Sequence, residues 1–281
     1  MACILHFWGQ SEQVVLLHPP DLPNTMKLKL TTSVAITMLA GLQISQAVTI
    51  NLTTSGTSGT ANGGLFVQID NGSTGTGVIE PFVRLQANGT EQGYNTDLKP
   101  MPDVKTGTWT KDILLSAVPV VSVGSIPYYQ FLLDINEQNN ENGRLLSLYQ
   151  LQIFTKLGAL TSADEYSDLT SGATKVWDLD VGSDGNSLIE LNYSLNPGSG
   201  YGDMFAYIPV SAVGTDLTKN LYLFSAFGTP QTSDAGFEEW AVLRNSTPPP
   251  SRVPDGGTTV TALGFALLGL GSIRKLIGSK G

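Results

Sequence analysis

Short apolar segments alternate with turn residues between residues 78 and 246 of the chain. In Leu148–Phe154 the apolar residues Tyr149, Leu151 and Ile153 alternate with glutamines, which is the two-residue period of a strand with one buried face. No stretch of this region keeps a helical period of about 3.6 residues for three turns. Such strands bury their apolar faces against a second sheet about 10 Å away. The pattern predicts an all-β domain, an antiparallel β-sandwich of jelly-roll-like character.

The predicted strands share apolar, β-branched or aromatic residues and are bounded by turn residues. They are Val78–Gln86, Ile113–Leu115, Val118–Val123, Tyr128–Asn136, Leu148–Phe154, Val176–Val181, Ser187–Ser194, Met204–Pro209, Leu221–Phe227 and Glu239–Leu243. We expect Pro119 at an edge or a bend, because proline has no N–H to donate to a sheet.

A leader of different composition, residues 48–77, precedes this region and is mostly Thr, Ser, Gly and Asn. Its apolar islands, Val48–Ile50 and Leu65–Ile69, are compatible with short strands. Between them, Thr53–Gly64 offers too little apolar area to offset the entropy of ordering it, so we expect a flexible segment.

The N-terminal part of the chain has the pattern of a secretory signal peptide at residues 26–47. Met26–Lys29 supplies a basic start, Leu30–Ile44 an apolar stretch, and the small residues that end at Ala47 a cleavage site. Cleavage is expected after Ala47. Residues 1–25 do not suit a position in front of such a signal, so we expect translation to begin at Met26.

The C-terminal part has three consecutive pieces. Residues 247–252 form a Pro-rich linker, which favours an extended, solvated backbone. A short motif follows and consists of Val253, Pro254, Asp255, Gly256 and Gly257. The uncharged run Thr258–Ile273 then ends at the basic residues Arg274 and Lys275, which favour the cytoplasmic side of a bilayer. Its 16 residues fall short of the roughly 20 that span a membrane comfortably, so we expect a marginal transmembrane helix within 253–275.

This arrangement resembles the PEP-CTERM/exosortase sorting signals of Gram-negative bacteria, in the variant that reads Val-Pro-Asp-Ser-Gly. Val253, Pro254, Asp255 and Gly257 match that motif, and Gly256 replaces its serine. The resemblance implies that an exosortase-type membrane enzyme recognises Val253–Gly257 after transient anchoring in the inner membrane. It also implies delivery to the cell envelope, surface or extracellular matrix. A simple C-terminal membrane anchor is the alternative.

Blocks of the central region are also similar to exported PEP-CTERM-type proteins without an assigned activity. These blocks are Arg84–Thr96, Phe131–Asn136, Gly198–Met204 and Gly236–Val242. This similarity implies the same export to the cell exterior and a sandwich fold, and it implies no catalytic mechanism.

Cysteine and histidine are confined to the first 25 residues, as Cys3, His6 and His18. The predicted exported domain therefore excludes disulfides, zinc sites built from His or Cys, and Ser-His-Asp or Cys-His catalysis. Residues 48–251 carry 21 acidic against 9 basic side chains. Such an acidic surface disfavours nucleic acid and anionic lipid as partners.

An acidic, glycine-rich segment is the candidate metal site. Asp178, Asp180 and Asp184, with Asp203 from another loop, offer the hard oxygen ligands that Ca²⁺ takes. The segment departs from the EF-hand template, and a hairpin turn accounts equally for its Asp, Gly and Asn content. The polar loop Glu137–Gly143 is expected to be a solvated turn.

Aromatic side chains in Gly/Asn-rich loops are the candidate ligand-binding residues. Tyr94 and Tyr201 could stack on sugar rings of an extracellular polysaccharide. Trp109, Tyr128 and Tyr129 could belong to the same stacking platform, but for most of these aromatics we expect burial in the sandwich. Glu238 and Glu239 adjoin Trp240, but neighbouring strand residues face opposite sides and would not flank one glycosidic bond.

The function that follows is non-enzymatic, a structural or adhesive role outside the cell. A carbohydrate-binding module with structural calcium is the first alternative. A polysaccharide-active enzyme that works with carboxylates is the second.

Overall fold

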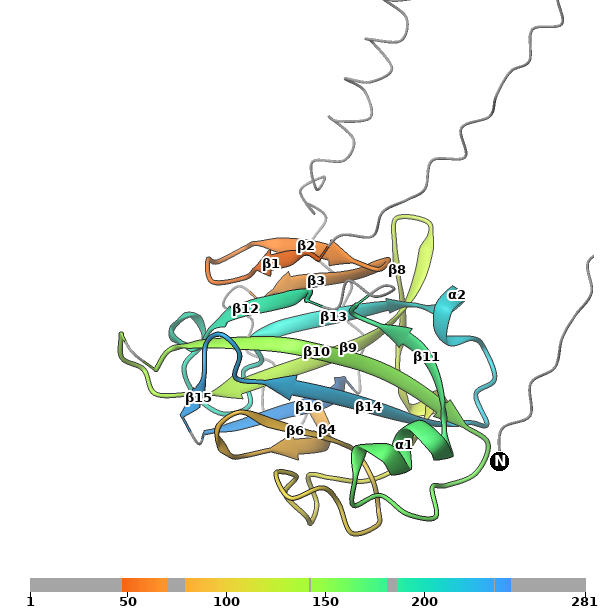
Figure 1. Cartoon of the computed structure of the whole chain (residues 1–281). Coiled ribbons are helices and arrows are strands. Elements are labelled where there is room, and N and C mark those ends of the chain that lie inside the picture. The colour runs from red at the N-terminus through yellow and green to blue at the C-terminus, as the bar shows by residue number, and fades with distance from the viewer. Residues whose placement is uncertain (1–46, 70–78, 142, 181–185, 235, 244–281) are drawn as a thin grey trace, which may run out of the picture. The chain divides into compact units, whose positions relative to one another are not determined.

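The computed structural model describes residues 47–69, 79–141, 143–180, 186–234 and 236–243 (Figure 1). These residues form mostly antiparallel β-sheets with few helices, as the alternating pattern predicts. The predicted signal peptide before Ala47 and the predicted helix within 253–275 lie outside the described residues. In the part of the chain that is described, no helix is long and apolar enough to cross a membrane.

The first sheet, sheet A, has seven strands. Its path runs through β1 (Thr49–Asn51), β12 (Leu188–Asn192), β10 (Leu145–Lys156), β14 (Asn220–Phe227) and β6 (Glu91–Tyr94), while β11 (Thr174–Asp178) pairs with β10 and β7 (Ile113–Leu114) with β14. The pairing of β1 with β12 is parallel, which departs from the wholly antiparallel arrangement expected.

The second sheet, sheet B, also has seven strands. Its path runs through β2 (Ser58–Ala61), β3 (Gly64–Gln68), β13 (Met204–Pro209), β9 (Ile126–Asn136), β16 (Phe237–Leu243) and β4 (Ile79–Leu85), and β8 (Val120–Val123) pairs with β9. A short pair, β5 (Asn88–Gly89) with β15 (Ser233–Asp234), forms a third sheet.

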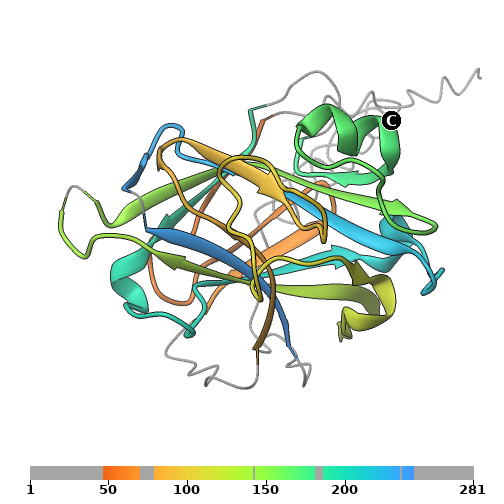
Figure 2. The same cartoon turned by 90° about the horizontal axis from the view of Figure 1, so that it is seen from below.

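The two large sheets share one apolar core, and Figure 2 shows their strands as separate layers. Trp240 of sheet B is fully buried, and its Nε1 donates a hydrogen bond to Ser225 Oγ of sheet A at 3.0 Å. Nearby, Phe66 of sheet B packs against Trp177 of sheet A with 6.2 Å between ring centroids. These contacts fix one sheet on the other and satisfy the indole N–H, which would be costly to bury without a partner.

A second apolar cluster lies on the other face of sheet B. Leu132, Tyr207 and Ala241 belong to it and are fully buried. Their strand neighbours Leu133 and Trp240 point into the main core instead. Successive residues of a strand face opposite sides of its sheet. The consecutive apolar residues in these strands therefore indicate that sheet B is buried on both faces.

Helices are short in this fold. α1 (Tyr166–Gly172) covers part of the outer face of sheet A, where the Tyr166 ring lies 4.5 Å from the Phe224 ring by centroid. A capping box formed by Glu165 and Asp168 closes its N-terminus. α2 (Val210–Val213) and the 3₁₀ turns η1 (Leu115–Ala117) and η2 (Tyr193–Leu195) complete the described helices.

The prediction of a flexible leader is wrong for Thr53–Gly64. Ser58–Ala61 forms β2, which pairs with β3, and Leu52 is fully buried. The flanking islands supply the reason, because Ile50 and Phe66 enter the main core and hold the polar residues between them against the sheets. Thr49–Asn51, Ser58–Ala61 and Gly64–Gln68 of the predicted leader therefore belong to the two sheets, as β1, β2 and β3.

Candidate functional sites

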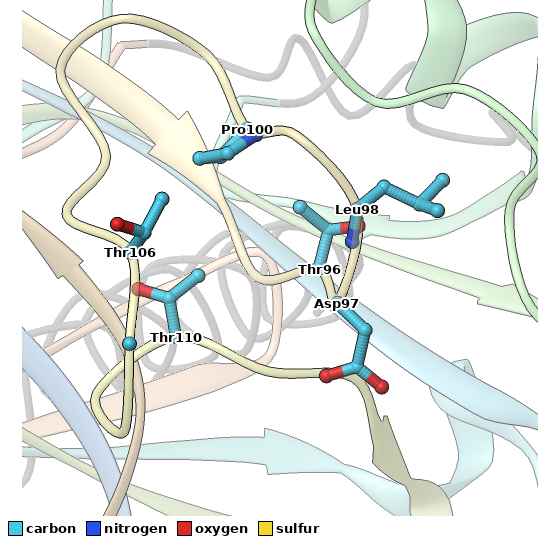
Figure 3. A pocket seen from close by; sticks show the side chains of 7 residues that line it. Thr96, Asp97, Leu98, Pro100, Thr106 and Thr110 are labelled. Atoms are coloured by element: carbon cyan, nitrogen blue, oxygen red, sulfur yellow. The ribbon is translucent and has the colours of Figure 1, made fainter.

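A pocket of about 240 Å³ lies in the loop that connects β6 to β7 (Figure 3). Thr96 and Leu98 line it from the first arm of the loop, and Thr106 and Thr110 line it from the second arm, with Pro100 between the arms. Among the described residues that line it, Asp97 alone is charged. The loop is held along the edge of β4, where Lys105 N donates to Arg84 O at 2.9 Å and Lys111 N to Phe82 O at 3.0 Å.

The floor of the pocket is buried and its rim is exposed. Thr96 and Thr110 keep only 2% and 7% of their surface exposed. Thr96 Oγ1 accepts a hydrogen bond from Leu98 N at 3.0 Å, and Thr110 Oγ1 accepts one from Arg84 N at 3.2 Å. Both hydroxyls thus accept from the backbone and keep an O–H to donate.

Trp109 stands beside this pocket and is 41% exposed. A Cβ added to the pocket residue Gly107 would lie 3.8 Å from the indole ring, so the two are in van der Waals reach. The guanidinium carbon of Arg84 lies 4.3 Å from the Trp109 ring centroid and 4.2 Å from that of Phe237. Stacked in this way, Arg84 holds the indole in one orientation. The burial expected for most of the candidate aromatics is found for Tyr128 and Tyr129 and not for Trp109, whose loop runs along the edge of the sheet.

Arg84 also neutralises buried carboxylates on sheet B. Its Nε donates to Glu239 Oε2 at 2.7 Å, and the two side chains form an ion pair. Asp134 is the neighbour of Glu239 across the β9–β16 pairing and is fully buried. Burial raises the pKa of Asp134 to about 6; the hydrogen bond from Gly200 N opposes this rise, Glu239 adds to it, and Arg84 opposes it.

A second acidic group lies near the short β5–β15 pair. Glu91 Oε2 accepts from Ala87 N at 2.7 Å, and Glu137 Oε2 accepts from Asp234 N at 2.9 Å. In each of these glutamates the other oxygen, Oε1, is buried and has no hydrogen-bond partner among the described residues. Burial is the main cause that raises the pKa of both glutamates to about 8. Glu137 is only 5% exposed, so the solvated turn expected here is wrong at its first residue.

The predicted metal ligands are not all brought together. Asp178 Oδ2 accepts from Lys175 Nζ at 2.6 Å and from Gln152 Nε2 at 3.1 Å, while Oδ1 accepts from Asp180 N at 3.2 Å. Asp203 instead precedes a strand of the other sheet, is 3% exposed, and accepts from Ile135 N at 2.8 Å. Asp203 therefore accepts a hydrogen bond from the backbone of sheet B and does not join the segment that contains Asp178.

Asp184 lies outside the described residues. Within the described ranges, no group of three or more His, Cys, Asp or Glu side chains could hold a metal ion. Calcium at Asp178 and Asp180 stays a prediction, and a melting temperature that is unchanged between EDTA and millimolar Ca²⁺ would contradict it.

The two tyrosines predicted to bind ligand lie in different environments. Tyr94 is 1% exposed, and its hydroxyl donates to Glu165 O at 3.1 Å. Because the segment leading into α1 covers it, Tyr94 presents no ring face to solvent, and the ligand-binding prediction is wrong for this residue. Tyr201 is 48% exposed in the loop before β13, so that prediction stays open for Tyr201.

The residues predicted to direct export and sorting lie at or beyond the ends of the described part of the chain. Ala47 is exposed and lies two positions before β1. The motif residues Val253, Pro254, Asp255, Gly256 and Gly257, and the basic residues Arg274 and Lys275, lie outside the described residues.

Comparison with known proteins confirms the sorting signal. Residues 252–277 match the family model of the VPDSG-CTERM motif, a PEP-CTERM-like variant of the exosortase sorting signals. No curated protein matches the chain. No solved structure matches it either.

Proposed function

We propose that this protein is a non-enzymatic structural or adhesive component of the cell exterior, delivered through its VPDSG-CTERM motif. The match at residues 252–277 is the observation that carries the proposal. A signal of this kind implies export, processing by an exosortase-type membrane enzyme, and association with the surface or envelope.

The order of the segments supports this route. The last described strand, β16, ends at Leu243, so the match begins nine positions after it. Such a separation leaves the motif available to a membrane enzyme while the two sheets stay folded. We propose that a signal peptide at residues 26–47 starts export, that the run Thr258–Ile273 holds the chain in the inner membrane, and that cleavage near Val253–Gly257 then releases it.

The proposed structural role is supported by how the domain uses its reactive groups. Residues 48–251 contain neither thiol nor imidazole. The buried carboxylates of Asp134, Glu137 and Asp203 accept hydrogen bonds from backbone N–H groups, and that of Glu239 pairs with Arg84. Each of these carboxylates thus stabilises the sheets or their loops.

The test is to replace Val253–Gly257 with alanines in the host cell and to follow the protein by fractionation and intact-mass measurement. The unaltered protein should appear outside the inner membrane, with a mass that ends near the motif. The variant should remain in the inner membrane with its C-terminal residues attached. Pro248→Ala in the linker is the matched control and should be processed normally. Equal processing of the motif variant would overturn the proposal.

A further inference from the structure

The pocket between the two arms of the β6–β7 loop has the polar groups that a neutral hydroxylated ligand needs. Thr96 and Thr110 each keep an O–H to donate from a nearly buried position. Thr106 is exposed and lies across the pocket from Thr96 (Figure 3). Hydroxyl groups of a ligand can accept these hydrogen bonds and donate in return, so a few such contacts fix its orientation.

Apolar surface complements these hydroxyls. Pro100 is buried in the lining, and Leu98 is 39% exposed at the rim. Trp109, next to the pocket residue Gly107, is stacked on Arg84 and keeps 41% of its surface exposed, so part of the indole is accessible to a ligand. Aromatic rings present apolar faces to the C–H groups of a pyranose, while the surrounding polar groups bind its hydroxyls. The pocket therefore combines apolar surface and hydroxyl groups, which complements the C–H groups and hydroxyls of a sugar ring.

The charge around the pocket and the volume of the pocket narrow the class of ligand further. The loop that forms the pocket balances its charges, with three acids, Asp97, Asp103 and Asp112, against three lysines, Lys99, Lys105 and Lys111. This balance does not attract an anionic sugar, and Asp97 in the lining repels one. A cation lacks a second lining carboxylate to hold it. The volume of about 240 Å³ is below the roughly 300–1,000 Å³ typical of pockets that enclose drug-sized ligands, which fits one sugar ring rather than a longer segment.

We propose that the Thr96–Thr110 pocket binds one neutral pyranose unit of a polysaccharide, with Trp109 as the stacking surface at its rim. The site is separate from the sorting signal and from Tyr201. It gives a surface protein a means of attachment to neutral glycan chains. The affinity is expected to be weak for a single ring, and repeated units along a polymer would raise it through multivalency.

The test is saturation-transfer NMR on the full chain, purified in a zwitterionic detergent that carries no sugar headgroup. The probes are neutral hexose oligosaccharides of α- and β-linked glucose, mannose and galactose, with a uronic-acid oligosaccharide for comparison. Thr106→Trp fills the pocket from an exposed position and should abolish the saturation signal. Trp109→Ala should weaken binding about tenfold, through loss of the stacking surface.

The matched control is Thr60→Trp, which places the same new side chain at an exposed position of β2, at the opposite edge of sheet B. This variant should bind like the unaltered protein. Thermal melting of each variant establishes that it is folded. Absence of binding to every neutral probe, preference for the uronic acid, or equal binding by Thr106→Trp would overturn the proposal. None of these results bears on the sorting of the protein, so the two proposals fail independently.

Discussion

Two pairs among the buried carboxyl groups of the described residues differ in whether they share an ion pair with a cation. Glu239 and Asp134 are 4% and 0% exposed, and Arg84 lies beside them. Glu91 and Glu137 are 1% and 5% exposed, and no described ion pair includes either of them. Burial is therefore nearly equal in the two groups, and the difference lies in the neighbours.

The pKa values of these buried carboxyl groups depend on the charged side chains beside them. Arg84 opposes the rise that burial causes in the pKa of Glu239. Glu91 and Glu137 form no described ion pair, and their pKa values reach about 8 even though Lys105 lowers that of Glu91. One group therefore stays buried as an ion pair, whereas the other stays buried largely by keeping its protons at neutral pH.

The largest expected effect comes from removing the shared cation. Arg84→Met should lower the free energy of unfolding by about 3–5 kcal/mol, because it leaves Glu239 buried without its partner. Urea unfolding at neutral pH measures the change. Lys111→Met is the matched control, since its ion pair with Glu80 is 36% and 42% exposed and should contribute at most about 1 kcal/mol.

A double variant sharpens the same comparison. Arg84→Met with Glu239→Gln removes both charges, so it should regain part of the stability lost in Arg84→Met. If the single variant is no less stable than Lys111→Met, Arg84 does not compensate the buried charge.

The next largest effect is a change in the pH dependence of stability that comes from Glu91 and Glu137. The folded-state pKa of Glu137 is about 8 against an ordinary 4.5, so the folded protein binds more protons than the unfolded chain between these values. Stability should therefore fall as pH rises from about 5 to 8, by roughly 1.4 kcal/mol per pH unit for each such carboxyl. Glu137→Gln should reduce that slope by about one proton, measured by urea unfolding across the range.

Glu91→Gln is the parallel variant and should reduce the slope similarly. Because Glu91 contributes to the raised pKa of Glu137, the two changes should not be strictly additive. A protein whose stability is flat from pH 5 to 8, or a Glu137→Gln variant with the original slope, would contradict the assignment of buried protons.

The strands could be predicted from the sequence, because their pattern is local. Each predicted apolar segment from Val78 onward overlaps an observed strand, from β4 to β16. Short elements such as β5, β6 and α1 were missed, since two to seven residues give too little periodicity. The sorting motif could also be predicted, because its residues act through their order in the chain.

The pocket and the buried acids depend on contacts between distant residues, so no local pattern predicts them. Trp109 is exposed because its loop follows the edge of β4, and Tyr94 is buried because the segment before α1 covers it. Glu137 follows a strand in a polar stretch that looks solvated in sequence. Its burial comes from Asp234, which donates to it from nearly a hundred positions later.

β1 joins its sheet beside β12, where Val48 N donates to Ser187 Oγ across 139 positions of sequence. A chain that crosses a membrane from its N-terminus brings out its first strand long before the partner of that strand. Sheet A therefore cannot be completed until the segment around Leu188 has emerged as well. On the export route proposed above, sheet A would therefore close late, after most of the domain has crossed the membrane.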